Sequence, residues 1–309
     1  MKSRKNAKGM KTPPFLRPGD RIAIVAPARW VTKEQIAPAL ATIEQWGFES
    51  VVYTQVYKKN HQFAGSDVAR ASALQKALDD PSVKAVVFAR GGYGTVRVLP
   101  LLDFRRFVQK SKWIVGFSDI TALHSYINRQ LGIKTLHAPM AVHFSEEKKS
   151  DIALHLLKDI LTGKNVEYSF PSHLLNRAGT CKGELIGGNL SVMYSLRGTP
   201  ADIDSKGKIL FLEDVDEYLY HIDRMMMNLK YSGVLKDLKG LVVGAFSDMK
   251  DNTVPFGKSA ERIILEAVKE YNYPVAFGFP AGHVKENWPL VMGSYVSLKI
   301  ANRCKLEFC

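Results

Sequence analysis

Three polar side chains that could perform acyl transfer each follow an apolar run of the chain. Ser118 comes shortly after "WIVG", Glu213 ends "KILFLE", and His283 lies just beyond "VAFGFPAG". A serine hydroxyl becomes a nucleophile when a histidine takes its proton, and a carboxylate orients that histidine. Apolar runs of this length are typical of buried strands, and sites in parallel sheets form beyond the carboxyl ends of the strands. The three residue types therefore predict nucleophilic hydrolysis at one edge of a sheet.

Each of the three residues also has a structural interpretation that the sequence leaves open. Ser118 or Asp119 could be the N-cap of the helix predicted from "ITALHSYINRQ". Glu213 could be an ordinary charged strand end, and His283 could have a structural role. The segment "GFSDI" keeps the first Gly of the nucleophile-elbow pattern G-x-S-x-G but has Ile120 in place of the second. The serine therefore needs partners before it can be assigned.

Three glycines in "FARGGYGTV" directly follow the third expected strand. Glycines at such a position let backbone N–H groups converge on an anion. The dinucleotide-binding pattern G-x-G-x-x-G is broken because Arg97 occupies its third glycine position. The alternative is an oxyanion hole that faces Ser118 from the neighbouring strand. The sequence has no histidine or cysteine spacing of a metal site, so we expect neither a metal nor a cofactor.

Strands and helices alternate along the first part of the chain, with strands expected at 21–28, 49–56, 84–89 and 112–116. This alternation predicts an α/β fold with a parallel sheet covered by helices on both faces. After about residue 145 the pattern changes to a charged amphipathic helix, a connector, and short strands and helices that end in a hairpin. The expected division is a basic tail (1–13), an N-terminal α/β domain that carries the nucleophile (14–145), a connecting segment (146–178), and a C-terminal domain that carries the Glu and the His (179–309).

The composition excludes several classes of protein. The chain has 309 residues, of which 46% are hydrophobic and 24% charged, as expected for a soluble globular protein. No apolar run approaches the roughly 18 residues that a membrane span needs, and the N-terminus lacks the apolar core of a signal peptide. Three scattered cysteines predict a reducing compartment, which we take to be the cytoplasm.

The net charge of +13 raises the question of nucleic acid. Five basic residues fall within the first eleven positions, and the rest of the chain intersperses both signs, with no basic block interleaved with aromatic residues. We therefore expect no nucleic-acid partner. A basic surface would still attract an acidic substrate.

Six sequence blocks between about Pro18 and Leu298 form a specific combination. They are "PGDRIAIVAPA", "ARGGYG", "GFSDITALH", "GGNLSVMYSLRGTP", "ILFLEDVDEYLYHIDRMM" and "GFPAGH". In this order they resemble the LD-carboxypeptidase family of serine peptidases, which also contains the microcin C immunity peptidases.

The resemblance implies a catalytic triad of Ser118, Glu213 and His283. It also implies an oxyanion hole made by the backbone N–H groups of Gly92 and Asp119. The implied fold has an N-terminal α/β domain like that of class I glutamine amidotransferases and a C-terminal mixed α/β domain with a small β-structure. The implied assembly is a homodimer.

The implied substrate is the murein tetrapeptide, from which such enzymes remove the terminal D-Ala by cutting an L,D amide bond in peptidoglycan recycling. Its free carboxylate needs a cation or N–H donors. We expect Tyr93 and Asn189 to contact the substrate, and Arg197 is a further cation to consider. Many family members have Gly after the triad histidine, where this chain has Val284, which bears on the path of the loop and on substrate choice. Two alternatives stay open: a peptidase of the same fold that hydrolyses another amide, such as a peptidyl-adenylate antibiotic, and a non-catalytic ligand-binding α/β protein.

Overall fold

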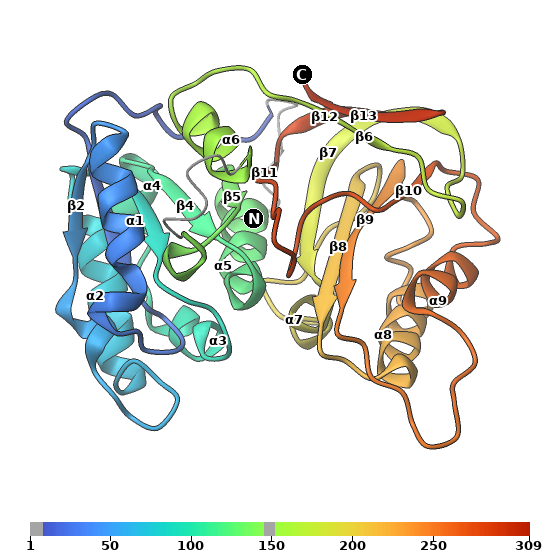
Figure 1. Ribbon diagram of the computed structural model, residues 1–309, viewed down its shortest axis with the longest axis horizontal. Helices are drawn as coiled ribbons and strands as arrows, with labels where there is room; N and C mark the ends of the chain where they lie inside the picture. The colour runs from blue at the N-terminus through green and yellow to red at the C-terminus, as the bar shows by residue number, and fades with distance from the viewer. Residues whose placement is uncertain (1–8, 145–151) are drawn as a thin grey trace, which may run out of the picture.

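Two β-sheets lie side by side in the computed structural model, which describes residues 9–144 and 152–309 (Figure 1). The first sheet has the strand order β11-β5-β4-β3-β1-β2, and the second has the order β10-β9-β8-β7-β12-β13-β6. Segments from the first part of the chain build most of the first sheet, and the second part builds the second sheet. The expected α/β class is confirmed.

The first sheet is parallel except at one edge. Its strands are β1 (Arg21–Val25), β2 (Glu49–Val52), β3 (Val83–Phe88), β4 (Trp113–Gly116), β5 (Thr135–His137) and β11 (Leu290–Met292), of which β11 runs antiparallel to β5. Its helices are α1 (Lys33–Gln45), α2 (Asp67–Asp79), α3 (Thr95–Val98), α4 (Arg105–Gln109), α5 (Thr121–Tyr126) and α6 (Ile152–Leu161). Short helical turns are η1 (Thr54–Tyr57), η2 (Leu99–Leu101), η3 (Ser118–Ile120), η4 (Ile127–Leu131) and η5 (Ala141–His143).

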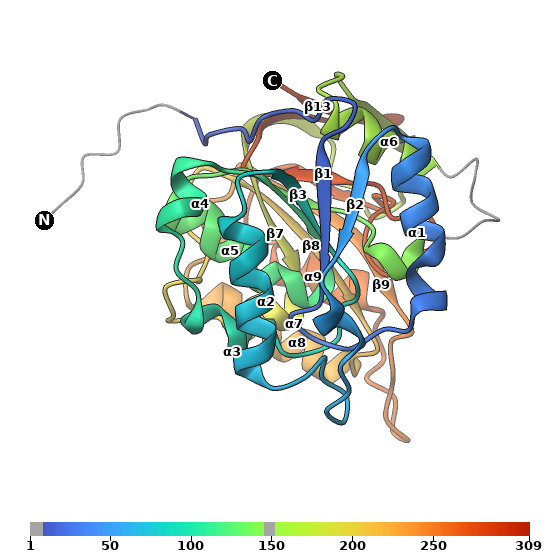
Figure 2. The ribbon, with the colours of Figure 1, turned by 90° about the vertical axis from the view of Figure 1, so that its left-hand side faces the viewer.

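Strand β1 shows why helices cover both faces of this sheet. Ile22 and Ile24 pack in the same apolar cluster as the buried side of α1, whereas Ala23 and Val25 pack with α2. Successive side chains of a strand point to opposite faces, so an uninterrupted apolar run needs cover on both. Figure 2 shows α1 and α2 on the two sides of the sheet.

The second sheet combines a parallel half with an antiparallel half. Its parallel strands are β7 (Gly179–Asn189), β8 (Ile209–Val215), β9 (Gly240–Ser247) and β10 (Val275–Phe277), and its antiparallel strands are β12 (Tyr295–Ile300), β13 (Arg303–Phe308) and β6 (Glu167–Pro171). Its helices are α7 (Leu190–Ser195), α8 (Leu219–Tyr231) and α9 (Ala260–Ala267). The expected C-terminal hairpin is the pair β12 and β13.

Two strands depart from a simple division of the chain. β6 falls within the expected connecting segment, yet it pairs with β13, and β11 follows the strands of the second sheet, yet it joins the first. The expected boundary at 145 lies outside the described residues, as does most of the basic tail. The proposed domain limits therefore stay a prediction.

One apolar cluster extends across both sheets. It joins Ile22 and Val115 of the first sheet to Phe211 and Val296 of the second. This cluster packs the two sheets against each other. Within residues 9–144 and 152–309, no helix has the length and apolar character needed to cross a membrane.

Candidate active site

Ser118 stands directly beyond the carboxyl end of β4, at the first position of η3. Its φ of 61° lies in the left-handed region that residues other than glycine rarely adopt, which is the strained turn expected of a nucleophile elbow. The helix that follows, α5, has Ile120 as its N-cap and no side-chain cap, so the interpretation of Ser118 or Asp119 as its N-cap is wrong. Ile120, in place of the second glycine of the elbow pattern, is fully buried.

The structure brings the three expected triad residues together. Ser118 Oγ lies 3.1 Å from His283 Nε2, and His283 Nδ1 lies 2.8 Å from Glu213 Oε2. The serine follows a strand of the first sheet, whereas the carboxylate belongs to β8 and the histidine follows β10 of the second sheet. This arrangement allows proton transfer from serine to histidine, with the carboxylate holding the ring.

The surroundings of His283 favour its protonated form. Burial alone would lower the pKa of the ring, but the hydrogen bond and the negative charge of Glu213 outweigh that effect, so the pKa of His283 is raised. Glu213 is completely buried, and the Phe117 ring packs 4.8 Å from the imidazole, centre to centre. A histidine in this setting is able to accept the serine proton.

The loop that carries His283 approaches Glu213 very closely. Gly282 has a φ of 112°, and a Cβ on it would lie 2.7 Å from Glu213 Oε2, so a larger residue would disturb the carboxylate. Asn287 Oδ1 accepts the Gly282 N–H at 2.8 Å and fixes the loop. The side chain of Val284, the residue that follows His283, is 41% exposed.

The loop that follows β3 contains Gly91, Gly92 and Gly94 and is called the glycine loop below. It lies against Ser118. A Cβ on Gly91 would stand 3.4 Å from Ser118 Oγ, and Gly92 follows with a φ of 111°. The Asp119 N–H is among the first N–H groups of a helical turn, which have no intrahelical acceptor. The loop after β3 and the helical turn that begins at Ser118 therefore lie next to each other.

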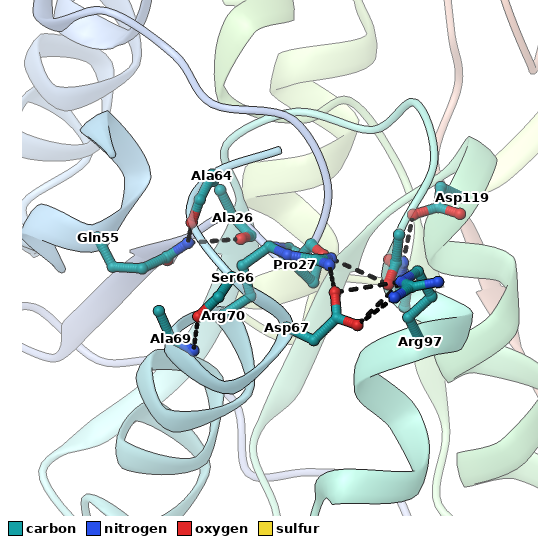
Figure 3. Close-up of polar contacts among 12 residues, drawn as sticks. Ala26, Pro27, Gln55, Ala64, Ser66, Asp67, Ala69, Arg70, Arg97 and Asp119 are labelled. Carbon is teal, nitrogen blue, oxygen red and sulfur yellow. Dashed lines mark hydrogen bonds and ion pairs between the residues drawn. The ribbon is translucent and has the colours of Figure 1, made fainter. Parts of the chain in front are cut away.

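The buried side chain of Arg70 stabilises the glycine loop through a hydrogen bond to the Gly94 carbonyl (Figure 3). Arg70 of α2 is completely buried, donates to the carbonyl oxygens of Pro27 and Gly94, and pairs with Asp67. Gly94 has a φ of 142°, and a Cβ on it would collide with the Arg70 guanidinium. The arginine thereby joins the loop after β1 to the loop after β3.

The Asp119 side chain supports the same loop from the other side. Its carboxylate accepts the Thr95 N–H at 2.8 Å and is buried. Burial raises the pKa of Asp119, and the hydrogen bonds with Thr95 offset that effect only in part. This contact could not be predicted from the sequence, because it joins residues that follow two separate strands and are 24 positions apart.

Asn189, expected to contact the substrate, also has a structural role. It is the N-cap of α7, and its Nδ2 donates to Asp214 Oδ1 at 3.0 Å. Asp214 Oδ2 in turn accepts the Ser191 N–H at 2.8 Å. Burial raises the pKa of Asp214 to about 7, and the charge of the adjacent Glu213 adds to that rise. The carboxylate after Glu213 is therefore part of the wall of the site, which sequence reasoning missed.

An open pocket lies over the triad. It is lined by Ser118 and His283 together with Arg29, Arg90, Tyr93 and Asn189, among others. Tyr93 is 48% exposed and packs against Phe63 at the rim. Arg197 does not line this pocket and is ion-paired with Asp202, so it is not the cation for a substrate carboxylate.

Metal-ligand candidates do not gather in this part of the molecule or elsewhere within the described residues. No three His, Cys, Asp or Glu side chains in 9–144 and 152–309 are arranged to hold a metal ion. The three cysteines, Cys181, Cys304 and Cys309, are free thiols.

Comparison with known families assigns both parts of the chain. The family model of the LD-carboxypeptidase N-terminal domain matches residues 22–138, and that of the LD-carboxypeptidase C-terminal domain matches residues 182–298. A Bacillus subtilis protein named "Probable murein peptide carboxypeptidase" is 32% identical over 305 residues, which cover 94% of this chain and 92% of that protein.

Solved structures show the same architecture. The crystal structure of muramoyltetrapeptide carboxypeptidase from Oxalobacter formigenes superposes with a TM-score of 0.83 at 30% identity, covering 93% of this chain and 98% of that one. The microcin C7 self immunity protein MccF, in complex with aspartyl sulfamoyl adenosine, has a TM-score of 0.86 at 20% identity, covering 96% and 97%. The second likeness establishes the fold alone.

Proposed function

The chain belongs to the LD-carboxypeptidase family of serine peptidases, and from that premise we propose that it hydrolyses the L,D amide bond that releases terminal D-Ala from murein tetrapeptides. Two relatives at 30% identity or more support the proposal: the Bacillus subtilis protein is named a probable murein peptide carboxypeptidase, and the Oxalobacter formigenes protein a muramoyltetrapeptide carboxypeptidase. The observation that carries the proposal is the hydrogen-bonded line from Ser118 through His283 to Glu213.

In the proposed first step, Ser118 Oγ attacks the carbonyl carbon of the residue before D-Ala while His283 Nε2 takes the hydroxyl proton. A new C–O bond forms, and the carbonyl oxygen becomes an oxyanion. The N–H groups of Gly92 and Asp119 would bind that oxyanion, and a single donor of this kind contributes a factor of roughly 10²–10³ in rate. Glu213 would stabilise the imidazolium that forms.

The intermediate then collapses. The C–N bond breaks, His283 delivers its proton to the leaving nitrogen, and D-Ala departs with a neutral amine. Water attacks the resulting ester with His283 again as the base, which releases the tripeptide and restores Ser118. The raised pKa of His283 supports its part as the acid in the first half of this cycle.

The test is direct. Purified protein is incubated with murein tetrapeptide, and D-Ala is quantified with a D-amino-acid oxidase assay while mass spectrometry follows the tripeptide. We expect stoichiometric release of both products from the wild type. A protein that leaves the tetrapeptide intact under conditions in which it is folded would overturn the proposal.

The same assay addresses the two alternatives. Hydrolysis of an aminoacyl or peptidyl adenylate analogue, without release of D-Ala, would favour the self-immunity activity. Binding of tetrapeptide without turnover of any amide would favour a non-catalytic protein. The spacing within the triad supports the catalytic interpretation over the second of these.

We further propose that the protein is a homodimer in the cytoplasm. The dimer rests on the family resemblance, and the compartment rests on three unpaired cysteines. Light scattering coupled to size-exclusion chromatography tests the dimer, and fractionation of the native host tests the compartment.

A further inference from the structure

We propose that Arg29 and Arg90 form a subsite that binds the free carboxylate at the end of the substrate and so make the enzyme a carboxypeptidase rather than an endopeptidase. This inference rests on the proposed function. It assigns the cation that the sequence left unassigned, and it names the chemical group that the cation recognises.

The topology of the first sheet aligns the two arginines with the nucleophile. Neighbouring strands follow the order β4-β3-β1. Ser118 follows β4, Arg90 follows β3, and Arg29 follows β1 a few residues on. All three lie beyond the carboxyl ends of parallel strands, and all three line the pocket over the triad.

Two consecutive glycines lie between the nucleophile and Arg29. The Cβ position of Gly91 lies 3.4 Å from Ser118 Oγ, and the Cβ position of Gly92 lies 3.1 Å from Arg29 Nε. Arg29 thus packs against Gly92, the glycine that is proposed to bind the oxyanion, and the preceding Gly91 lies against Ser118. In a carboxypeptidase substrate only three covalent bonds, about 4 Å, separate the attacked carbon from the terminal carboxylate carbon. Such a substrate therefore requires a cation close to the nucleophile, and Arg29 lines the same pocket and contacts the loop that lies against Ser118.

The charges that line the pocket leave these two arginines available. Neither guanidinium makes a hydrogen bond or ion pair with another residue in 9–144 or 152–309. The two carboxylates that line the same pocket are both engaged: Asp214 with Ser191, and Asp216 with Lys250 at 2.7 Å. A planar guanidinium matches a carboxylate with two parallel hydrogen bonds, which gives geometric selectivity as well as charge.

The experiment compares two substrates that differ only at the end of the chain. One is the murein tetrapeptide with its free carboxylate, and the other is the same peptide with a C-terminal amide, which would release D-alaninamide. We expect wild-type kcat/KM to favour the acid by a factor of about 10–100, the range of a hydrogen bond to a charged group. We expect Arg29→Met and Arg90→Met each to raise KM for the acid while changing the amide little, so that the preference shrinks, and shrinks most in the double variant.

Controls separate recognition from folding. Arg29→Lys keeps the charge and should retain part of the preference, whereas Arg105→Met removes an exposed arginine of α4 outside the pocket and should change neither substrate. Circular dichroism and melting curves verify that each variant is folded.

Three outcomes would count against the inference. The first is equal cleavage of acid and amide by the wild type, and the second is full preference for the acid in the double variant. The third is an equal loss of activity on both substrates in folded single variants. Each of these would overturn the arginine subsite and leave the proposed function standing. A wild type that cleaves neither peptide would instead overturn the proposed function, and this inference with it.

Discussion

The Ser118 hydroxyl lies 3.1 Å from His283 Nε2, the position of a nucleophile beside its base. Ser118→Ala removes Oγ and leaves the backbone turn, so we expect turnover of tetrapeptide to fall to the residual level that binding and the oxyanion donors supply, with the fold unchanged. D-Ala release and near-ultraviolet circular dichroism measure the two effects. Ser195→Ala, at an exposed position of α7, is the matched control and should keep full activity. A folded Ser118→Ala protein with substantial activity would show that another group is the nucleophile.

Glu213 and Asp214 are adjacent carboxylates with different partners. Glu213 bonds to His283, whereas Asp214 bonds to Ser191 and Asn189. Glu213→Gln cannot stabilise the imidazolium and offers an N–H that favours the wrong tautomer, and the analogous change in serine proteases lowers kcat about 10⁴-fold. We expect a loss on that scale for Glu213→Gln and a much smaller change in kcat for Asp214→Asn.

Steady-state kinetics on purified Glu213→Gln and Asp214→Asn proteins measures the loss of kcat in each. If Asp214→Asn proved the more damaging to kcat while both proteins remained folded, Asp214 would be the triad carboxylate. A β-bulge between Leu212 and Asp214 breaks the pairing with β9, so simple alternation along the strand does not decide which carboxylate faces the histidine.

The raised pKa of Asp214 leads to a prediction of how the free energy of unfolding varies with pH. Burial is the main cause of the rise, which brings the pKa to about 7 in the folded state. In the unfolded state the pKa of Asp is about 4, so the folded state binds the Asp214 proton more tightly. The free energy of unfolding should therefore fall as pH rises from about 4 to about 7, by up to about 1.4 kcal/mol per pH unit from this group. Urea unfolding at several pH values measures the slope. Asp214→Asn should flatten it, and an unchanged slope would show that Asp214 does not carry the effect.

At the scale of elements, strand ends were the most predictable part of the site. The β-branched, apolar runs predicted β1, β3, β4 and β8, and two residues of the expected triad lie at the ends of these strands: Ser118 beyond β4 and Glu213 within the last residues of β8. Ser66, the N-cap of α2, accepts the Ala69 N–H through its side chain, a contact that spans only three residues.

The contacts that the sequence could not predict are all long-range. Arg70 supports the glycine loop through a hydrogen bond to Gly94, 24 residues away in the chain, and nothing local marks it as buried. Strand β11 has only three residues, too short for a period of two to stand out. Its partner is known only once the sheet is formed.

The support of the glycine loop by α2 leads to a prediction of its own. Arg70→Met should lower kcat by about 10²-fold, the effect of losing one oxyanion donor, because Gly92 is no longer held in place, while KM changes less. Arg70→Lys keeps a donor and should recover part of kcat. Thermal melts accompany the kinetics, since loss of a buried ion pair also destabilises the fold. A folded Arg70→Met variant with wild-type kcat would show that the loop keeps its position without the arginine.

At the scale of the whole molecule, the ligand sets that a metal would need are lacking within residues 9–144 and 152–309. We therefore expect EDTA to leave the rate of D-Ala release unchanged. The measurement is the initial rate after dialysis against chelator, with and without added zinc. Loss of activity that zinc restores would contradict the serine mechanism.

The segment that carries His283 passes from one sheet to the other. It leaves β10 of the second sheet and ends in β11, which pairs with β5 of the first. The two sheets share an apolar cluster that includes Leu290 of β11, so the histidine is held between two bodies that are packed together. Activity and global stability should therefore depend on the same contacts.

This connection predicts that the chain unfolds in one cooperative transition. Leu290 is completely buried in the shared cluster, and Leu235 is completely buried in a cluster on the outer face of the second sheet. Replacing either leucine by Ala should cost about 2–5 kcal/mol, through lost burial and the cavity that remains. If the sheets unfold together, both variants shift one common calorimetric peak to lower temperature. If the two bodies unfold independently, the wild type would show two peaks, with Leu290→Ala moving mainly the first-sheet peak and Leu235→Ala only the other, and the crossing of β11 would not couple them.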